Sequence, residues 1–289
     1  MKILILGADG MIGHKIAHSL GDDFELILTS RKNISSESIG ITNGKMILHN
    51  LITDSLDSLL DNTTPDIIIN CVGITTRRGV EDNIAFTRLL NSELPFKLNS
   101  WVNSNSKKLI HFSTDCVFSG SKGNYHDSDL PDAEDIYGTT KAAGEVDSPN
   151  TLTIRCSMIG RELYNFTELF EWLINNKNQK IEGYSKVFYS GITTVRMGKI
   201  LNQILKQSIN LSGIYNISSV PISKLDLLIK LSNAFSLNVD VIENTNIKSN
   251  KVLISEKFTE ITGIYPPNWD DLIFELKDDC EKFKSLYKN

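Results

Sequence analysis

Residues 2–13, KILILGADGMIG, decide how this chain folds. They begin with one lysine and four aliphatic residues, a pattern typical of a strand that is buried on both faces of a parallel sheet. Glycines follow at a G-x-x-G-x-x-G spacing, and a helical pattern then continues to about Leu20. Glycines let the backbone approach an anion, and the free N–H groups at the start of the helix attract it. A glycine-rich turn without a ligand has the same composition, but the strand–loop–helix setting favours a phosphate site. Its predicted residues are Gly7, Gly10, Met11, Ile12 and Gly13.

The alternation of buried strand and helix continues through the first 160 residues. Further strands are expected near 24–28, 45–48, 67–70, 108–112 and 151–155, with helices near 53–61 and 80–104 and around 137–141. Such regular alternation implies right-handed crossovers and a doubly wound parallel sheet.

Beyond Gly160 the pattern loosens. Helices are expected near 162–177 and 193–207, and a strand at 213–217 looks as if it rejoins the sheet. Ser223, followed by Asp226, predicts the N-cap of a further helix. The predicted fold is α/β, with a Rossmann-type dinucleotide-binding domain over residues 1–160 and 192–218. A smaller α/β substrate-binding region is expected over 161–191 and 219–289.

Composition narrows the class of protein. The 289 residues carry a net charge of −5, which argues against nucleic acid as a partner. No apolar run approaches a membrane span, and the apolar start is too short for a secretion signal. The four cysteines are scattered and predict neither a disulfide framework nor a metal site. We expect a cytoplasmic protein with reduced cysteines and no membrane partner.

The end of the second strand bears on the choice of dinucleotide. An acidic residue here would hold the ribose hydroxyls of NAD. This chain instead has Ser30, Arg31 and Lys32. A hydroxyl and two cations suit a 2′-phosphate, so NADPH is predicted, with NADH and a plain solvated basic loop as the alternatives. The ends of the third and fourth strands should lie beside the same cofactor, through Asn50, Leu51, Cys71, Val72 and Gly73.

Tyr137 and Lys141 are the residues on which chemistry would depend. A spacing of four places them on one face of a helix, where an ammonium can favour the ionised form of a phenol. Alone, such a pair is usually part of a solvated surface. Thr114 strengthens the catalytic interpretation, because it follows the fifth strand at the edge where open α/β sheets place their chemistry.

Together these motifs resemble those of the extended short-chain dehydrogenase/reductases over nearly the whole chain. The resemblance rests on the glycine loop, Asn70-x-x-Gly73, Asn91, Thr114 and Tyr137-x-x-x-Lys141. Within that family the chain looks most like the dTDP-4-dehydrorhamnose reductase group, through residues 113–120, STDCVFSG, and 137–145, YGTTKAAGE.

The resemblance implies NADPH-dependent reduction of the 4-keto group of a nucleotide-activated 6-deoxyhexose. Tyr137 would be the proton donor, Lys141 would lower its pKa and bind the nicotinamide ribose, and Thr114 would hold the carbonyl oxygen. Asn91 would support the lysine. The residues expected near the carboxamide are Ser157 and Met158.

Cys116 departs from the group, which has a tyrosine there. In related epimerase/reductases a cysteine at this position is the epimerisation base, with a histidine or lysine partner. Lys180 and Lys186 are the candidates for that partner in this chain, whose histidines end at His126. A small buried residue is the simpler interpretation of Cys116.

Three further alternatives stay open. A UDP-linked N-acetylamino 4-keto sugar is as plausible a substrate as the dTDP-linked one. A non-catalytic NADP-binding regulatory subunit, like that of methionine adenosyltransferase, resembles the same group. The family includes both monomers and homodimers.

Overall fold

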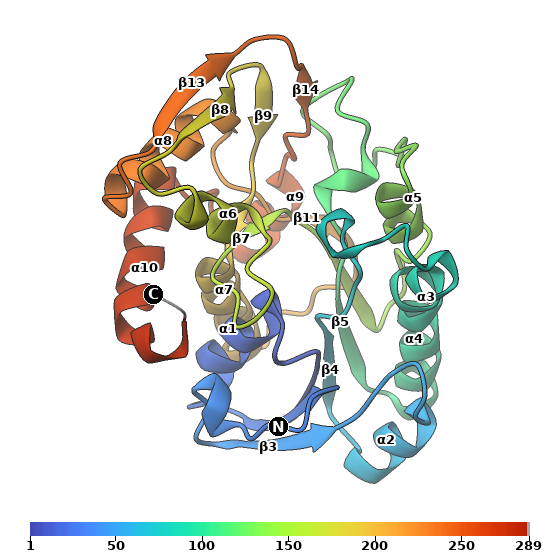
Figure 1. The fold of residues 1–289 in the computed structure, drawn as a ribbon. Helices are drawn as coiled ribbons and strands as arrows, with labels where there is room; N and C mark the ends of the chain where they lie inside the picture. The colour runs from blue at the N-terminus through green and yellow to red at the C-terminus, as the bar shows by residue number, and fades with distance from the viewer. Residues whose placement is uncertain (288–289) are drawn as a thin grey trace.

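A seven-stranded parallel sheet lies at the centre of the computed structural model, which describes residues 1–287 (Figure 1). In spatial order the strands are β11 (Gly213–Asn216), β6 (Thr151–Arg155), β5 (Lys108–Phe112), β4 (Ile67–Asn70), β1 (Lys2–Leu6), β2 (Glu25–Ser30) and β3 (Gly44–Leu48). The chain runs outward from β1 in one direction and then from β4 in the other, so the order reverses between these two neighbours. Open α/β sheets bind ligands at such a point, outside the carboxyl ends of the strands.

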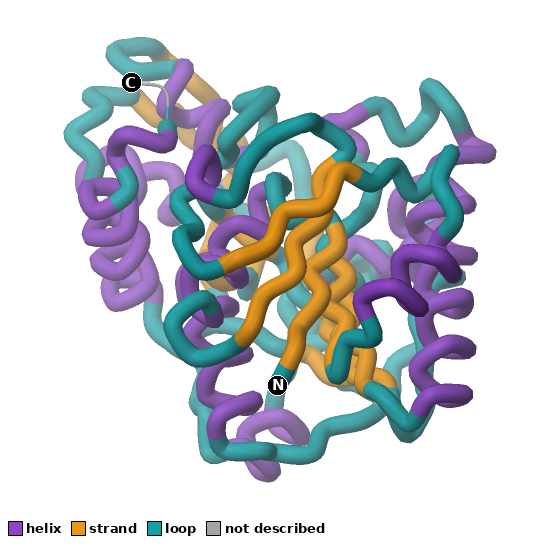
Figure 2. The backbone as a smooth tube through the Cα atoms, turned by 90° about the horizontal axis from the view of Figure 1, so that it is seen from below, coloured by secondary structure: helices purple, strands orange, loops and turns teal. Residues whose placement is uncertain are grey.

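Alternate residues of the buried strands pack into two separate cores. Ile3 and Ile5 of β1 belong to one core, whereas Leu4 and Leu6 belong to the other, and all four are inaccessible to solvent. Helices α1 (Met11–Leu20) and α7 (Thr194–Lys206) cover the first face, and α2 (Leu56–Thr63) and α4 (Leu94–Asn105) cover the second. Figure 2 shows helices on both sides of the sheet. The doubly wound sheet predicted from the sequence is confirmed.

The remaining elements build a second, smaller layer of short strands and helices. It contains β8 (Lys180–Tyr184) paired with β13 (Asp240–Asn244), and β9 (Val187–Tyr189) between β12 (Ile222–Ser223) and β14 (Ser249–Asn250). Strands β7 (Met158–Ile159) and β10 (Ile192–Thr193) pair beside them. The helices are α6 (Leu169–Asn175), α8 (Lys224–Ala234), α9 (Glu256–Thr262) and α10 (Trp269–Lys282). In Figure 1, β8, β9, β13 and β14 lie at the end of the molecule opposite β3.

Two expected helices differ from those observed. The helix expected near 162–177 is shorter, because α6 begins only at Leu169 and Asn165 and Phe166 before it have positive φ. The helix expected over 80–104 consists of α3 (Ile84–Arg88), a π-helical turn (Leu89–Glu93) and α4. The expected N-cap is confirmed, since Ser223 Oγ accepts the backbone N–H of Asp226 at 3.0 Å.

Candidate active site

The glycine loop after β1 forms the floor of a cavity at the switch point. Gly7 has φ +74°, a conformation that a side chain would strain. A Cβ on Gly13 would overlap the Gly7 carbonyl, so this glycine lets α1 pack against the loop without lining the cavity itself. The predicted cofactor residues that line the cavity are Gly7, Gly10, Met11, Ser30, Arg31, Lys32, Asn50, Leu51, Cys71, Val72 and Gly73.

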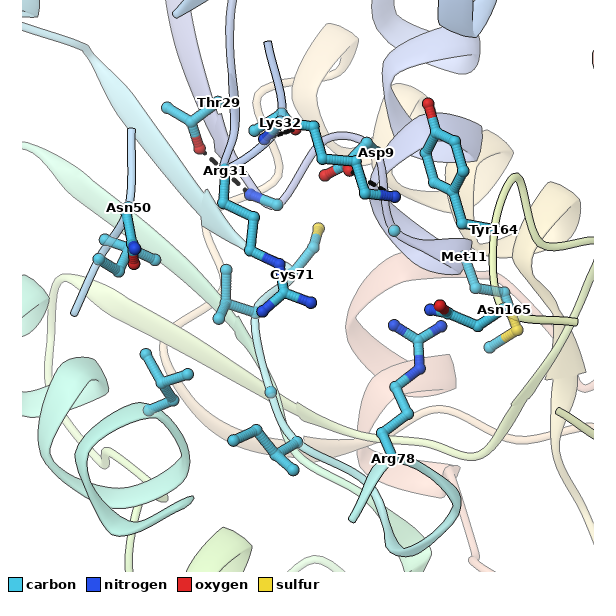
Figure 3. Close-up of a pocket in the computed structure, with 18 of the residues that line it drawn as sticks. Asp9, Met11, Thr29, Arg31, Lys32, Asn50, Cys71, Arg78, Tyr164 and Asn165 are labelled. Carbon is cyan, nitrogen blue, oxygen red and sulfur yellow. Dashed lines mark hydrogen bonds and ion pairs between the residues drawn. The ribbon is translucent and has the colours of Figure 1, made fainter. Parts of the chain in front are cut away.

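Arg31 and Arg78 direct their guanidinium groups into this cavity from different walls (Figure 3). Lys32 is held differently, because its ammonium lies 3.0 Å from the centroid of the Tyr164 ring and 3.9 Å from a carboxylate oxygen of Asp9. Arg78 is paired as well, with the carboxylate of Glu162. Arg31 is therefore the cation of this cavity that is best placed to meet an anion.

The loop before α6 supplies residues that sequence analysis missed. Glu162, Leu163, Tyr164 and Asn165 line the cofactor cavity. No motif marks them, because their contribution comes from a backbone path that crosses back over the glycine loop.

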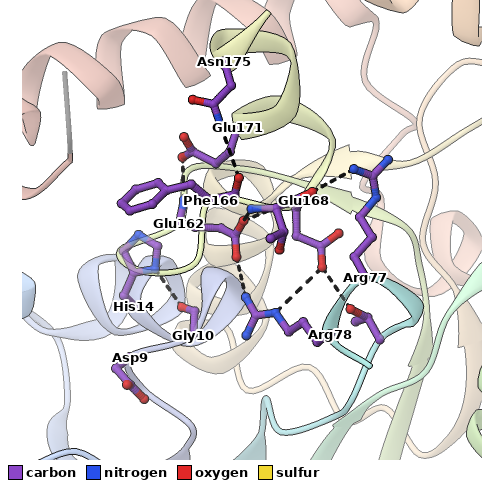
Figure 4. Close-up of polar contacts among 12 residues, drawn as sticks. Asp9, Gly10, His14, Arg77, Arg78, Glu162, Phe166, Glu168, Glu171 and Asn175 are labelled. Atoms are coloured by element: carbon purple, nitrogen blue, oxygen red, sulfur yellow. Dashed lines mark hydrogen bonds and ion pairs between the residues drawn. The ribbon is translucent and has the colours of Figure 1, made fainter. Parts of the chain in front are cut away.

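Glu162 joins this loop to the segment after β4. Its carboxylate accepts a hydrogen bond from Arg78 at 2.5 Å and the backbone N–H groups of Thr167 and Glu168 at 2.6 and 2.8 Å. On the same side, Arg77 donates to the Thr167 carbonyl at 2.7 Å (Figure 4). Residues 162–168 and 75–78 thus form a strap across the cavity.

Tyr137 and Lys141 line an adjoining cavity together with Ile12 of the glycine loop. Asp135 begins their helix, α5 (Ile136–Ala142), by accepting the backbone N–H of Gly138 at 2.8 Å. Burial raises the pKa of Tyr137 well above its usual range, while a hydrogen bond with Thr114 opposes the shift. The tyrosine and the threonine are therefore neighbours, as their expected roles require.

The Lys141 ammonium donates to the Phe112 carbonyl at 2.6 Å, at the carboxyl end of β5. Burial lowers the pKa of Lys141 to about 8, and the Glu145 carboxylate opposes this shift. The side chain is thus cationic at neutral pH and fixed at the sheet edge.

Asn91 lies one layer behind the cavity, on the π-helical turn, and is inaccessible to solvent. Its side chain accepts from Ile74 N at 2.9 Å and donates to Ile74 O at 3.0 Å. It also donates to Thr140 Oγ1 at 3.2 Å, beside Lys141 in the chain. Asn91 therefore tethers α5 to the loop after β4 and lines neither cavity.

Ser157 and Met158 follow β6 and lie outside the cofactor cavity. They line a second, outer cavity with Trp172, Tyr189 and Lys224, and neither is among the residues of the cofactor cavity. Glu168 lines both the outer cavity and that of Tyr137, so the two adjoin.

Cys116 lies two residues after Thr114, and the Thr114 hydroxyl accepts the backbone N–H of Cys116 at 3.1 Å. Burial and, to a lesser extent, the charge of Asp115 raise the pKa of its thiol to about 12, and Lys251 opposes them. Of its expected partners, Lys186 is exposed, and Lys180 is a surface residue 3.9 Å from Asp240 that lines the outer cavity.

A family model described as "RmlD substrate binding domain" matches residues 1–273. The chain belongs to this family. It is 25% identical over 307 residues to a protein of Aggregatibacter actinomycetemcomitans named dTDP-4-dehydrorhamnose reductase, covering 96% of this chain and 98% of the relative. Several other relatives match over about half of this chain and half of their own length.

Solved structures of proteins named dTDP-4-dehydrorhamnose reductase share the fold. A dTDP-4-dehydrorhamnose reductase from Bacillus anthracis, crystallised with NADP, superposes with a TM-score of 0.78 at 18% identity, covering 96% of this chain and 99% of that one. A third relative, methionine adenosyltransferase 2 subunit beta of Bos taurus, is 25% identical over 152 residues, which are 50% of this chain and 41% of the bovine protein. No helix within residues 1–287 is long and apolar enough to cross a membrane.

Proposed function

We propose that this RmlD-family protein reduces the 4-keto group of a nucleotide-activated 6-deoxyhexose with NADPH. The observation that carries the proposal is the placement of Tyr137 and Lys141 in one cavity that adjoins the glycine loop, with Thr114 in hydrogen-bonding reach of Tyr137. The names of the full-length relative and of the Bacillus anthracis structure support the same activity.

The cofactor cavity fits a phosphorylated dinucleotide. Gly7 and Gly10 leave room for a diphosphate against the start of α1, and Arg31 and Arg78 point into the space beside it. Arg31 follows the strand end where a 2′-phosphate would lie, which favours NADPH over NADH. When bound, the cofactor supplies the hydride.

The protein residues supply the proton and hold the carbonyl. Burial raises the pKa of Tyr137, so the phenol is protonated at neutral pH, although it is a weaker acid than a free tyrosine. It can still pass its proton to the more basic alkoxide that forms on reduction. Thr114 hydrogen-bonds the carbonyl oxygen as charge develops on it. The Lys141 charge, one helical turn away, favours the phenolate that remains after proton transfer.

The two layers of the fold contribute mainly to the binding of different ligands. Residues 1–160 and 192–218, joined by the pairing of β11 with β6 and the packing of α7 against α1, hold most of the cofactor, and residues 162–165 complete its cavity. Residues 161–191 and 219–289, of which the last two lie outside the described chain, bind the nucleotide sugar. Trp172 and Tyr184 in the outer cavity offer aromatic surface to a base or a sugar ring.

Loss of NADPH absorbance tests the activity, with dTDP- and UDP-linked 4-keto-6-deoxyhexoses as substrates. Tyr137→Phe should lower kcat by about 10²- to 10⁴-fold, because the proton donor is lost, and should leave NADPH binding nearly unchanged. A Tyr137→Phe enzyme with wild-type turnover would refute the catalytic assignment. NADPH binding without turnover on any of these substrates would instead favour a regulatory subunit, as in the bovine relative's name.

Epimerisation through Cys116 is the second candidate, and the burial of its thiol counts against it. A thiol with a pKa of about 12 is protonated at neutral pH and is a poor base. Reduction in D₂O checks this directly. No deuterium is expected at the carbons next to the keto group beyond exchange without enzyme. Incorporation that disappears in Cys116→Ala would establish the bifunctional enzyme.

A further inference from the structure

Lys224 is a cationic residue of the C-terminal layer that lines the outer cavity. It is the first residue of α8, directly after the capping residue Ser223. The cavity wall that it joins also contains Met158, which follows β6, and Glu168, which is shared with the cavity of Tyr137. Lys224 therefore lies beside the space where the sugar must meet the catalytic residues.

The ammonium of Lys224 has no hydrogen bond or ion pair with any residue in the described chain, 1–287. It lies 3.6 Å from the centroid of the Tyr189 ring, and Tyr189 is only 3% exposed. An aromatic face attracts a cation but cannot accept bonds from all three of its N–H groups. The cavity therefore presents donors that a ligand oxygen could satisfy.

Charged groups on neighbouring elements define the field around this ammonium. Burial lowers the pKa of Lys224 to about 8, Asp115 and Cys116 after β5 oppose the shift, and Arg77 adds to it. The other titratable residues that line the cavity are Glu168, Lys180, Glu182, Tyr184 and Tyr189.

The turn at Asp115 and Cys116 lies close enough to both Lys224 and Tyr137 to act on them electrostatically. The same two residues also influence the pKa of Tyr137. Thr114 immediately precedes them and caps their turn. A sugar whose carbonyl oxygen meets Thr114 and Tyr137 would thus present its neighbouring oxygens toward Lys224.

We propose that Lys224 binds the hexose of the substrate by donating a hydrogen bond to a hydroxyl oxygen next to the reacting carbonyl. The proposal rests on the reductase function above and adds a specificity-determining residue to its substrate site. The buried Asp115 carboxylate, 5% exposed, disfavours a diphosphate at this place, because it would repel a second anion. Arg77, which is exposed, is better placed for the phosphates.

The position of Lys224 gives substrate binding a dependence on pH. Its ammonium form predominates below about pH 8 and its neutral amine above. A charged donor makes the stronger hydrogen bond. KM for the sugar nucleotide should therefore rise as pH increases through about 8. Lys224→Met should remove this rise without changing the pH dependence of KM for NADPH, to which Lys141 contributes.

Steady-state kinetics of Lys224→Met test the proposal, with Lys180→Met as a control for a more exposed lysine on the same cavity. Loss of a charged hydrogen bond should raise KM for the sugar nucleotide about 10- to 100-fold and remove the step near pH 8. KM for NADPH should stay within about twofold, and Lys180→Met should keep the wild-type pH profile. A substrate analogue that lacks the neighbouring hydroxyl should bind the wild type and Lys224→Met with similar KM.

The outcomes separate this proposal from the function on which it rests. Wild-type enzyme without turnover refutes the reductase itself, before any variant is made. An active enzyme whose Lys224→Met variant keeps the KM and the pH profile of the wild type refutes the role of Lys224 alone. If Lys224→Met is poorly folded, Lys224→Gln, which retains a neutral donor, must still lose the pH step, and its persistence would overturn the proposal.

Discussion

Arg31 and Lys32 are adjacent cations that the structure assigns to different surroundings. Arg31 points into the cofactor cavity, whereas Lys32 lies against Tyr164 and near Asp9. Their charges are equivalent in the sequence, so the pattern of cations alone predicts equal roles in holding a 2′-phosphate. The two side chains differ in the structure because they point in different directions and because the loop that carries Tyr164 contacts Lys32.

Arg31→Ala should therefore weaken NADPH binding more than Lys32→Ala does. Loss of a bidentate phosphate contact should raise KM for NADPH by about 10- to 100-fold. Lys32→Ala should have a smaller effect, because the lysine contributes mainly through the Tyr164 ring. Initial rates with NADPH and NADH measure both variants, and KM for NADH should change little in either. Equal losses with both cofactors would show that these residues do not read the 2′-phosphate.

At the scale of elements, the sequence of residues 2–20 predicts the observed structure well. Continuous apolar residues followed by spaced glycines have few alternatives to a buried strand and a tight loop, and the observed β1 and α1 agree with them. Residues 162–168 are the opposite case. Their helical composition is overridden by the Glu162 carboxylate, which accepts backbone N–H groups from Thr167 and Glu168. Such a contact depends on tertiary placement, which local periodicity does not encode.

Glu162→Ala should open the strap between 162–168 and 75–78. The change leaves Arg78 and two backbone N–H groups without their acceptor, and Glu162 itself is only 1% exposed. A loss of about 2–4 kcal/mol in the free energy of unfolding is expected. Urea unfolding measures it, and limited proteolysis should show faster cleavage within 162–168.

Glu168→Ala is the matched control, since this more exposed carboxylate accepts from Thr75 Oγ1 at 3.0 Å and supports no backbone turn. It should lose less stability than Glu162→Ala. Equal losses in the two variants would show that the strap is not organised by Glu162.

At the scale of the whole molecule, the C-terminal segment closes onto the first helix. Lys15 of α1 forms a buried ion pair with Asp279 of α10 at 2.7 Å and donates to the Tyr287 hydroxyl at 3.2 Å. His14 hydrogen-bonds both that hydroxyl and the Gly10 carbonyl of the glycine loop, at 3.0 and 2.8 Å. The two ends of the described chain thus support the cofactor site together. Sequence analysis named neither Lys15 nor Asp279, because 264 positions separate them and each alone fits a helix surface.

Removing one charge of this ion pair should lower the free energy of unfolding more than removing both charges. Burial lowers the pKa of Lys15 and raises that of Asp279, so each charge depends on the other. Asp279→Asn leaves the buried cation unpaired and should lower the free energy of unfolding by about 3–5 kcal/mol. The double variant Lys15→Met/Asp279→Asn should recover much of that loss, because no uncompensated charge remains. Lys230→Met, which breaks an exposed pair with Asp270, should change the free energy of unfolding little. Urea unfolding of the four proteins measures these differences. A double variant no more stable than Asp279→Asn would mean that the buried charge is not what destabilises the single variant.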